Sequence, residues 1–203
     1  MDLPICVVVP HMKSRAWFFE RYTLPSIRAN NPSRIIIEEG AGGACEKRNA
    51  GAAKASQPFI IFVDDDTVLG GDCLSKMHAM LEWDISAGYA YSGYTAVVWP
   101  GVRHPMNGNY TIGSRVFDAE ALRRENYVDT TSLMRTVLFP GFDPKFERLQ
   151  DWDLWLTMLG QGIHGRFIAD QLFMKFNIDE GISVKIPREG AESILKKKHR
   201  LSW

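Results

Sequence analysis

Three short apolar runs stand out in the first 70 residues of the chain. They cover residues 5–9, which Pro10 ends, residues 35–37 and residues 59–63. Continuous runs of this length, rich in β-branched and aromatic residues, are typical of strands that are buried on both faces. We therefore predict three buried strands of a parallel sheet in this part of the chain.

The segments between these runs have helical character. We predict one helix from about residue 17 to residue 29, which Pro25 bends or restarts because proline has no backbone N–H. A second helix is predicted over residues 45–55, where alanines and glycines permit close packing. This β-α-β-α-β order with short connections predicts a doubly wound parallel sheet with right-handed crossovers. Such sheets bind ligands beyond the carboxyl ends of their strands.

The remainder of the chain is less regular. Residues 111–140 show no clear periodicity, and residues from 187 onward are polar and include a basic cluster at 196–200, which we expect to be a solvated tail. The other expected elements are a turn at 67–71, a helix at 72–85 with Asp72 as its N-cap, a strand at 89–98, a helix at 151–159, and late strands at 167–168 and 172–176.

Composition adds little to this picture. The chain has 203 residues, enough for one domain with a sizeable core. Lys+Arg and Asp+Glu number 24 each, so net charge argues neither for nor against a polyanionic partner. No apolar stretch approaches the roughly 20 residues of a membrane helix, and the first residues do not resemble a signal peptide. Cys6, Cys45 and Cys73 show no metal-ligand spacing, so we expect reduced thiols and a cytoplasmic location.

Three consecutive carboxylates, Asp64, Asp65 and Asp66, follow the third strand. They repel one another, and such a cluster is costly unless a cation or several hydrogen-bond donors neutralise it. Hard divalent cations prefer oxygen ligands, so one interpretation is a metal–diphosphate site. The other is an acidic turn, because Asp is common in turns. His11 and residues 38–43 also follow strands, which favours a site at this edge.

Four sequence elements, in this order, resemble the GT-A-fold glycosyltransferases of family 2. They are a first strand ending VVVP at residue 10, KRNAG at 47–51, FVDDD at 62–66, and GFD at 141–143 followed by QDWDLW at 150–155. The resemblance covers about residues 5–183. It implies an α/β, GT-A (Rossmann-like), mostly parallel sheet flanked by helices in a single domain, residues 1–186. The nucleotide-sugar half would be about 1–70, the acceptor half about 71–186, and residues 187–203 a polar, basic tail.

The resemblance assigns roles to the acidic residues. Asp64 and Asp66 match the DxD motif, in which the first acid faces the ribose or sugar and the last binds Mn²⁺ or Mg²⁺ that bridges the diphosphate. Asp65 takes the variable middle place, and strand alternation would turn its side chain away. Asp179 stands where many members have a metal-binding His, and a carboxylate can also bind a hard cation.

The resemblance also implies contacts to the donor, a UDP- or GDP-sugar. Arg48 matches a basic residue that lies close to the nucleotide-sugar. Pro10 and His11 lie where the family contacts the nucleobase. Glu38 or Glu39 stands where many members have a base-contacting Asp, so the identity of the base stays open.

Asp151 matches the Asp of the family's ED motif, which implies a general base that deprotonates the acceptor hydroxyl. Gln150 replaces the acid that precedes it in the family, and Asp153 is the alternative base. A single base and an in-line displacement would invert the anomeric centre. The competing interpretation of Asp151 is a helix N-cap without catalytic function.

The leading hypothesis is therefore a metal-dependent glycosyltransferase that acts on a hydroxyl acceptor. A glycan is the expected acceptor, and a lipid-linked, protein or modified DNA-base hydroxyl remains open. Trp99, Arg103 and His104 lie in a loop and are candidate acceptor contacts. Trp152 and Trp155 are expected in the core.

Two other functions fit parts of the pattern. A nucleotidyltransferase acting on a sugar phosphate also holds metals with acids on an open α/β sheet, although it does not explain the QDWD element. A sugar-nucleotide-binding module without activity would be consistent with Gln150 and Asp179, where the chain departs from the family pattern.

Overall fold

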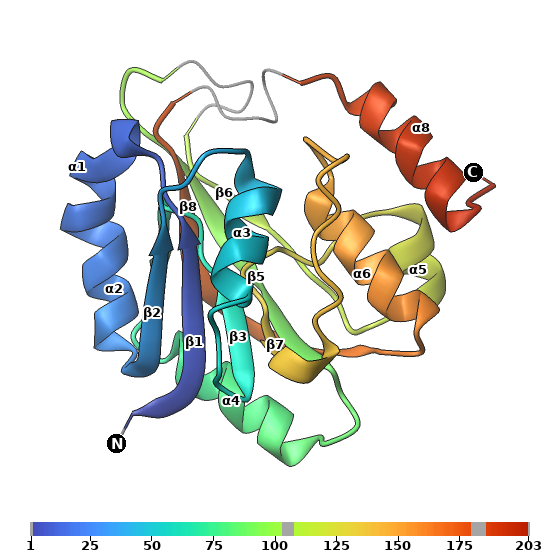
Figure 1. Ribbon diagram of the computed structural model, residues 1–203, viewed down its shortest axis with the longest axis horizontal. Helices are drawn as coiled ribbons and strands as arrows, with labels where there is room; N and C mark the ends of the chain where they lie inside the picture. The colour runs from blue at the N-terminus through green and yellow to red at the C-terminus, as the bar shows by residue number, and fades with distance from the viewer. Residues whose placement is uncertain (1, 103–107, 180–185, 203) are drawn as a thin grey trace.

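The computed structural model describes residues 2–102, 108–179 and 186–202, and its centre is one mixed β-sheet (Figure 1). The strand order is β2-β1-β3-β7-β5-β8-β4, and β6 pairs with β5. The strands are β1 Leu3–Pro10, β2 Pro32–Glu38, β3 Phe59–Phe62, β4 Thr67–Leu69, β5 Tyr89–Val98, β6 Tyr110–Ile112, β7 Leu133–Arg135 and β8 Gly165–Asn177.

Strands β1, β2 and β3 run in one direction. β1 pairs in parallel with β2 and β3, and β5 pairs in parallel with β8, whereas β4, β6 and β7 pair antiparallel with their neighbours. This mostly parallel sheet confirms the predicted fold class. The carboxyl ends of β1, β2 and β3 therefore open at the same edge, where a ligand site is expected.

Helices cover both faces of the sheet. They are α1 Ala16–Phe18, α2 Leu24–Ala29, α3 Ala44–Ala52, α4 Cys73–Trp83, α5 Ala119–Arg124, α6 Gln150–Gly160 and α8 Arg188–His199, with 3-10 turns η1 Lys13–Arg15 and η3 Thr136–Leu138 and a π-helical turn η2 Phe19–Thr23. In Figure 1 the blue α1 and α2 lie at the left of the view and the orange α6 at the right; Ile27 of α2 packs in the same core as α4, whereas Trp152 of α6 packs in the other core.

Two hydrophobic cores fill the space between the sheet and its helices. Val8 and Phe62 belong to the core that contains α6, whereas Val7 and Ile61 belong to the core that contains α4. Adjacent residues on each strand thus enter opposite cores, as strand geometry requires. Burial on both faces explains why the sequence of these strands is continuously apolar.

Helix α3 packs unusually close to β1. A Cβ added at Gly51 would lie 2.3 Å from Cγ1 of Val8, so a larger residue has no space there. This contact confirms the close packing that the small residues predict. It also fixes the position of α3, which carries Lys47 and Arg48 to the carboxyl edge of the sheet.

Proline at position 25 changes the predicted first helix as expected. The helical path runs from η1 to the end of α2, and Pro25 lies at the start of α2, where its missing N–H cannot bond to the turn before it. The π-helical turn η2 directly precedes it. The helical segment begins earlier than predicted, because η1 already includes Arg15.

Several predictions for the second half of the chain were wrong in detail. Residues 67–69 are strand β4 and not a turn, because their backbone pairs antiparallel with β8. The two predicted late strands are the single strand β8. Asp72 is the N-cap residue of α4 as predicted, but its side chain makes no capping hydrogen bond and pairs with Lys76 instead. The region at 111–140 contains β6, α5 and β7, which are too short to show periodicity.

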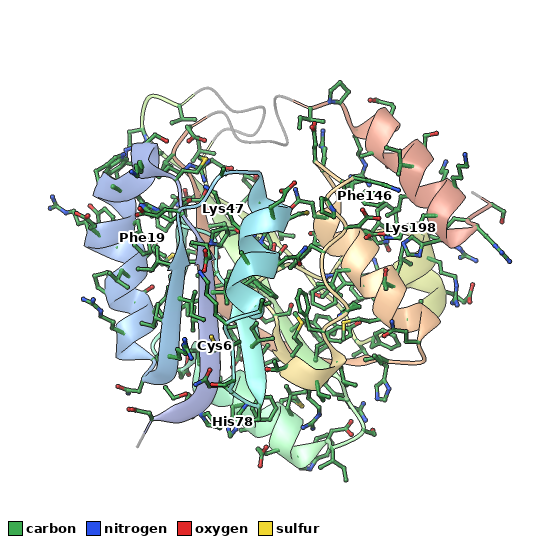
Figure 2. All side chains as sticks on the ribbon, in the orientation of Figure 1. Cys6, Phe19, Lys47, His78, Phe146 and Lys198 are labelled. Carbon is green, nitrogen blue, oxygen red and sulfur yellow. The ribbon has the colours of Figure 1, made fainter. Side chains whose placement is uncertain are left out.

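The predicted C-terminal tail contains helix α8, which packs on the α6 side of the molecule. Leu195 is completely buried in the core there. Lys198 Nζ lies 2.8 Å from Asp153 and 2.9 Å from Asp143. It also lies over the ring of Phe146, and Lys198 and Phe146 are both labelled in Figure 2. The expectation of a solvated basic cluster is therefore wrong for Lys198, which is part of a packed helix.

Asp153 is held by this same helix. His199 Nε2 lies 2.7 Å from Asp153 Oδ1, opposite the contact from Lys198. Asp153 is only 2% exposed. Both oxygens of this buried carboxylate thus pair with side chains of α8, and the base at Asp151 or Asp153 stays a prediction.

Trp152, Trp155 and the three cysteines are all buried. Trp152 and Trp155 are completely buried, and their indole N–H groups donate to backbone carbonyls, which confirms them as core residues. Cys6, Cys45 and Cys73 are free and buried. Within the described ranges, no helix is both long and apolar enough to cross a bilayer.

Candidate active site

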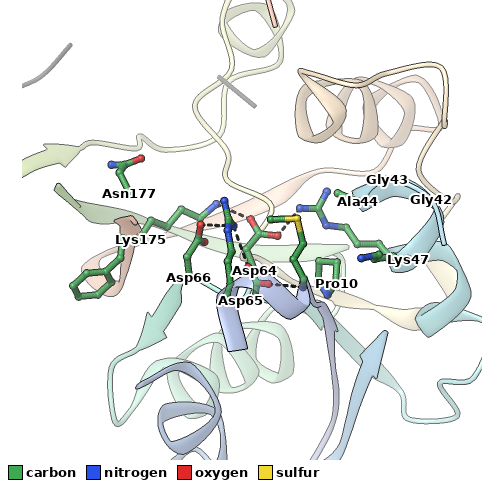
Figure 3. Close-up of a pocket in the computed structure, with 14 residues that line it drawn as sticks. Pro10, Gly42, Gly43, Ala44, Lys47, Asp64, Asp65, Asp66, Lys175 and Asn177 are labelled. Atoms are coloured by element: carbon green, nitrogen blue, oxygen red, sulfur yellow. Dashed lines mark hydrogen bonds and ion pairs between the residues drawn. The ribbon is translucent and has the colours of Figure 1, made fainter. Parts of the chain in front are cut away.

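A cavity of about 370 Å³ opens at the carboxyl edge of β1 and β3 (Figure 3). It contains all three carboxylates of the acidic cluster and several basic side chains. Its lining residues are Pro10, Met12, Arg15, Gly42, Gly43, Ala44, Lys47, Arg48, Asp64, Asp65, Asp66, Lys175, Phe176 and Asn177. Because they come from the loops after β1, β2 and β3 and from the end of β8, the topology of the sheet assembles the cavity.

Asp64 lies between two cations. Arg48 Nη2 donates to Asp64 Oδ1 at 2.5 Å, and Lys175 Nζ lies 3.4 Å from Asp64 Oδ2. Burial would raise the pKa of Asp64, but Arg48 and Lys175 outweigh burial and hold that pKa below its ordinary range. Arg48 also donates to Gln150 at 2.6 Å, so the residue that replaces the family's acid supports the arginine.

Asp65 fixes the loop that follows β1. Its carboxylate accepts the backbone N–H of Met12 at 2.7 Å, contacts His11 Nδ1 at 3.1 Å and accepts from Arg15 at 3.0 Å. Asp65 is 2% exposed. These contacts identify it as the residue that joins the acidic cluster to the first loop.

Arg15 joins the two other predicted metal ligands. Its Nη1 donates to Asp66 Oδ2 at 2.8 Å, while Nε and Nη2 donate to Asp179 at 2.8 and 2.6 Å. A guanidinium thus lies between Asp66 and Asp179, where the resemblance to family 2 places a divalent cation.

The arrangement of donors does not fit a divalent metal ion. Asp64, Asp66 and Asp179 each bind an arginine or lysine already. Among residues 2–102, 108–179 and 186–202 there is no group of three His, Cys, Asp or Glu side chains that could hold a metal. Mn²⁺ and Mg²⁺ need oxygen ligands that converge on one point. The positions of these side chains therefore do not support binding of the expected divalent metal ion.

Asp66 has an unusual protonation equilibrium. Burial raises its pKa to about 7 against the attraction of Arg15, and the neighbouring Asp64 and Asp65 add to the increase. The folded chain thus holds a proton on Asp66 at pH values where an ordinary Asp, with a pKa of 3.8, has lost it.

The pKa of Asp66 predicts a pH-dependent effect of Asp66→Asn. Between pH 4 and pH 7 the folded state binds one more proton than the unfolded state at this residue, so wild-type stability falls as pH rises, by up to about 1.4 kcal/mol per pH unit from this group. Asparagine cannot ionise. We expect urea denaturation to show that Asp66→Asn gains stability relative to wild type as pH rises through this window.

Asp170→Asn is the matched control, because the side chain of Asp170 is 54% exposed and pairs with Lys76 on the surface. Its stability relative to wild type should stay nearly constant over the same pH range. A stability difference between Asp66→Asn and wild type that does not change with pH would contradict the assignment.

Asp151 lies in a second, smaller pocket of about 60 Å³. Asn126 Nδ2 donates to Asp151 Oδ2 at 2.8 Å, and the backbone N–H of Trp152 donates to Oδ1 at 2.9 Å. Burial raises the pKa of Asp151, and repulsion from Asp129 raises it further. The N-cap of α6 is Leu149, which has a positive φ of 63°, so Asp151 is not the helix cap.

Lys175 connects the two pockets. Its Nζ lies 2.9 Å from Asp129 and 3.4 Å from Asp64. Asp129 lines the second pocket together with Asp151, whereas Asp64 lines the first. Lys175 therefore links the pocket that contains Asp151 with the cavity that contains the acidic cluster.

Three predicted donor contacts are not among the residues that line the first cavity within the described chain. His11 is buried between Asp65 and the ring of Phe19. Glu38 pairs with Lys54, and Glu39 is half-exposed with its carboxylate 3.9 Å from His11 Nε2. Their roles in donor binding remain predictions.

The loop that was expected to contact the acceptor is described only in part. Trp99 packs against Trp17 and Phe18, with ring centroids 5.4 and 5.5 Å apart. Arg103 and His104 lie outside the described residues.

Five residues of the two pockets were not identified from the sequence. Arg15 belongs to a polar segment directly after the first strand, and Lys175 is the only charge in an apolar run, so both carried a signal. Lys47 is part of the KRNAG element. Asn126 and Asp129 lie in the irregular region, where the pattern gave no indication of a site.

A comparison of the sequence with protein families agrees with the fold and the site described above. Residues 23–139 match the family described as Glycosyl transferase family 2. This match includes more than half of the chain, from η2 through β3 and the acidic cluster to the end of β7. The chain therefore belongs to glycosyl transferase family 2.

Solved structures show the same fold. TarS from S. aureus, residues 1–349, aligns with a TM-score of 0.57 at 13% identity over 87% of this chain and 61% of that chain. The same protein in complex with UDP-GlcNAc aligns with a TM-score of 0.63 at 12% identity, over 96% of this chain and 64% of that chain. At such identity the likeness concerns the GT-A fold alone. A search among curated proteins gave no match.

This chain is shorter than those structures. It spans 61% of TarS 1–349 and 44% of the longer TarS structure. The likeness thus extends to one part of TarS.

Proposed function

We propose that this protein transfers a sugar from a nucleotide-sugar donor to a hydroxyl acceptor. The observation that carries this proposal is the pairing of two pockets in a family 2 chain. A basic cavity lies at the carboxyl edge of the sheet, and a carboxylate with a raised pKa lies directly beside it.

The first cavity suits the diphosphate of a donor. Lys47, Arg48 and Lys175 line it, and each can form charge-assisted hydrogen bonds to phosphate oxygens. Arg48 keeps its Nε–H without a hydrogen-bond partner among the described residues, although it is buried. A buried donor without a partner is costly, and a phosphate or sugar oxygen would satisfy it.

The family and the solved structures of TarS support the choice of donor. TarS was crystallised with UDP and with UDP-GlcNAc, and its fold aligns with most of this chain. We therefore take a UDP-sugar as the first donor to test, and a GDP-sugar as the second. Asp64 would face the ribose or sugar, as the DxD position implies.

Asp151 would act as the base. The acceptor hydroxyl oxygen forms a bond to the anomeric carbon, the bond from that carbon to the phosphate oxygen breaks, and the nucleoside diphosphate leaves. Asp151 takes the proton of the hydroxyl, and its raised pKa brings its basicity closer to that task. One base on the face opposite the leaving group gives inversion.

The lining of the second pocket supports a polar acceptor. Polar groups line it beside Asp151, including Ser92, Tyr94 and Ser114. Hydroxyl-rich walls of this kind suit a sugar hydroxyl. We therefore propose a glycan acceptor, and protein, lipid-linked and modified DNA-base hydroxyls are the other acceptors to test.

Product formation from a panel of UDP- and GDP-sugars tests this function. We expect release of nucleoside diphosphate that increases when a suitable glycan is added, and a new sugar on the acceptor by mass spectrometry. Pyrophosphate release from a nucleoside triphosphate and a sugar 1-phosphate would instead support a nucleotidyltransferase. Donor binding without release, with every acceptor class, would support a binding module and contradict transfer.

A further inference from the structure

We propose that Arg15 is the resident cation of the acidic cluster, and that the donor diphosphate binds here without a divalent metal ion. This inference rests on the proposed function, because it concerns how the same cavity holds the leaving group. It departs from the metal dependence that the sequence resemblance implies.

The contacts of Arg15 are those of a built ion site. Its guanidinium donates four hydrogen bonds through its three nitrogens, to Asp65, Asp66 and Asp179, at 2.6–3.0 Å. The side chain is 14% exposed, so water screens these pairs weakly. Two bonds to Asp179 form a bidentate pair, which is the geometry arginine favours.

A divalent ion would have to displace Arg15 from these carboxylates. The guanidinium would then lose three acidic partners in a site that is mostly buried, and an uncompensated buried charge is strongly unfavourable. The metal's own gain is reduced as well, because Asp64 is already paired with Arg48 and Lys175. These carboxylates therefore cannot bind Arg15 and a divalent ion strongly at the same time.

The charge of the cavity favours an anion without added metal. Four basic side chains line it, Arg15, Lys47, Arg48 and Lys175, together with Asp64, Asp65 and Asp66, and Asp179 and Asp129 pair with Arg15 and Lys175 at its border. A metal is needed where acids alone face a diphosphate, since the two would repel each other. Here Lys47, whose Nζ donates to the backbone carbonyl of His11, and the Nε–H of Arg48, which has no partner among the described residues, can bind the diphosphate instead.

Two measurements test this proposal. In titration calorimetry with UDP-GlcNAc and GDP-mannose, we expect wild type to bind at least one of them in EDTA, with an affinity that Mn²⁺ changes by less than about threefold. In Mn²⁺ titrations followed by electron paramagnetic resonance without nucleotide, we expect Arg15→Gln to bind Mn²⁺ at least about tenfold more tightly than wild type.

Control variants separate the local effect from a general change in charge. The exposed Arg28→Gln, on α2, also removes one positive charge and should bind Mn²⁺ as wild type does. Arg15→Lys keeps the charge without the planar fork and should retain donor binding in EDTA with reduced affinity. If a thermal melt shows that Arg15→Gln does not fold, Arg15→Lys takes its place in the comparison with wild type.

Two results would overturn the proposal. One is loss of wild-type donor binding in EDTA that Mn²⁺ restores, and the other is Mn²⁺ binding by wild type that is as tight as by Arg15→Gln. Failure of both sugar nucleotides to bind wild type under any condition would instead contradict the donor assignment. The nucleotide-free Mn²⁺ titration still decides the role of Arg15 in that case.

Discussion

Replacement of Asp151 by Asn is expected to lower turnover by roughly 10²–10⁴-fold, the usual contribution of a general base. Asparagine keeps the size of the side chain and can accept one of the two hydrogen bonds from Asn126 and Trp152, but it cannot accept the proton of the acceptor hydroxyl. Donor affinity should change little, because Asp151 lies in the second pocket and not in the donor cavity. Steady-state kinetics at saturating donor, together with donor calorimetry, measure the two quantities separately.

Glu147→Gln is the matched control for this substitution. Glu147 is an exposed acid just before the same helix, so the variant makes the same chemical change outside the pocket. It should keep wild-type turnover. Turnover of Asp151→Asn within a few-fold of wild type would show that another group takes the proton.

Replacement of Lys175 by Met is expected to lower the free energy of unfolding by about 2–4 kcal/mol, because it leaves the buried Asp129 without its cation and Asp64 with Arg48 alone. Lys175 lies 2.9 Å from Asp129 and 3.4 Å from Asp64, and it is 21% exposed. Methionine preserves most of the volume of the lysine side chain, so the loss should reflect charge. Urea denaturation at neutral pH measures the effect.

Two further variants show whether the effect comes from these carboxylates. Lys76→Met removes a lysine that pairs with Asp72 and Asp170 on the surface, and it should change stability little. Adding Asp129→Asn to Lys175→Met should recover part of the lost stability, because one unpaired carboxylate is then neutral. Equal losses in Lys76→Met and Lys175→Met would contradict the special role of Lys175.

The strands of the first half could be predicted because burial on both faces leaves a plain signal. Val7 and Val8 enter opposite cores, so the whole run must be apolar. The position of the acidic cluster then followed from the topology, since Asp64 comes directly after a central strand. The same reasoning failed for β4 and β8, whose pairing is set by residues about a hundred positions apart in sequence.

Partners of the acidic cluster could not be predicted in the same way. The sequence shows that Asp64, Asp65 and Asp66 need neutralisation, but a metal ion and a set of basic side chains satisfy that need equally well. Which one is present depends on Arg15 and Lys175, which come from the two ends of the chain and meet only in the folded protein. Asp129 and Asn126 likewise reach Asp151 from a region without periodicity.

The central claim is that the cavity at the carboxyl edge of β1 and β3 holds the nucleotide-sugar. Hydrogen–deuterium exchange with and without a saturating sugar nucleotide tests it most directly. We predict protection of the loop after β1, residues 42–48, residues 64–66 and the end of β8, with little change in α4. Protection confined to other segments, or none with every UDP- and GDP-sugar, would contradict it.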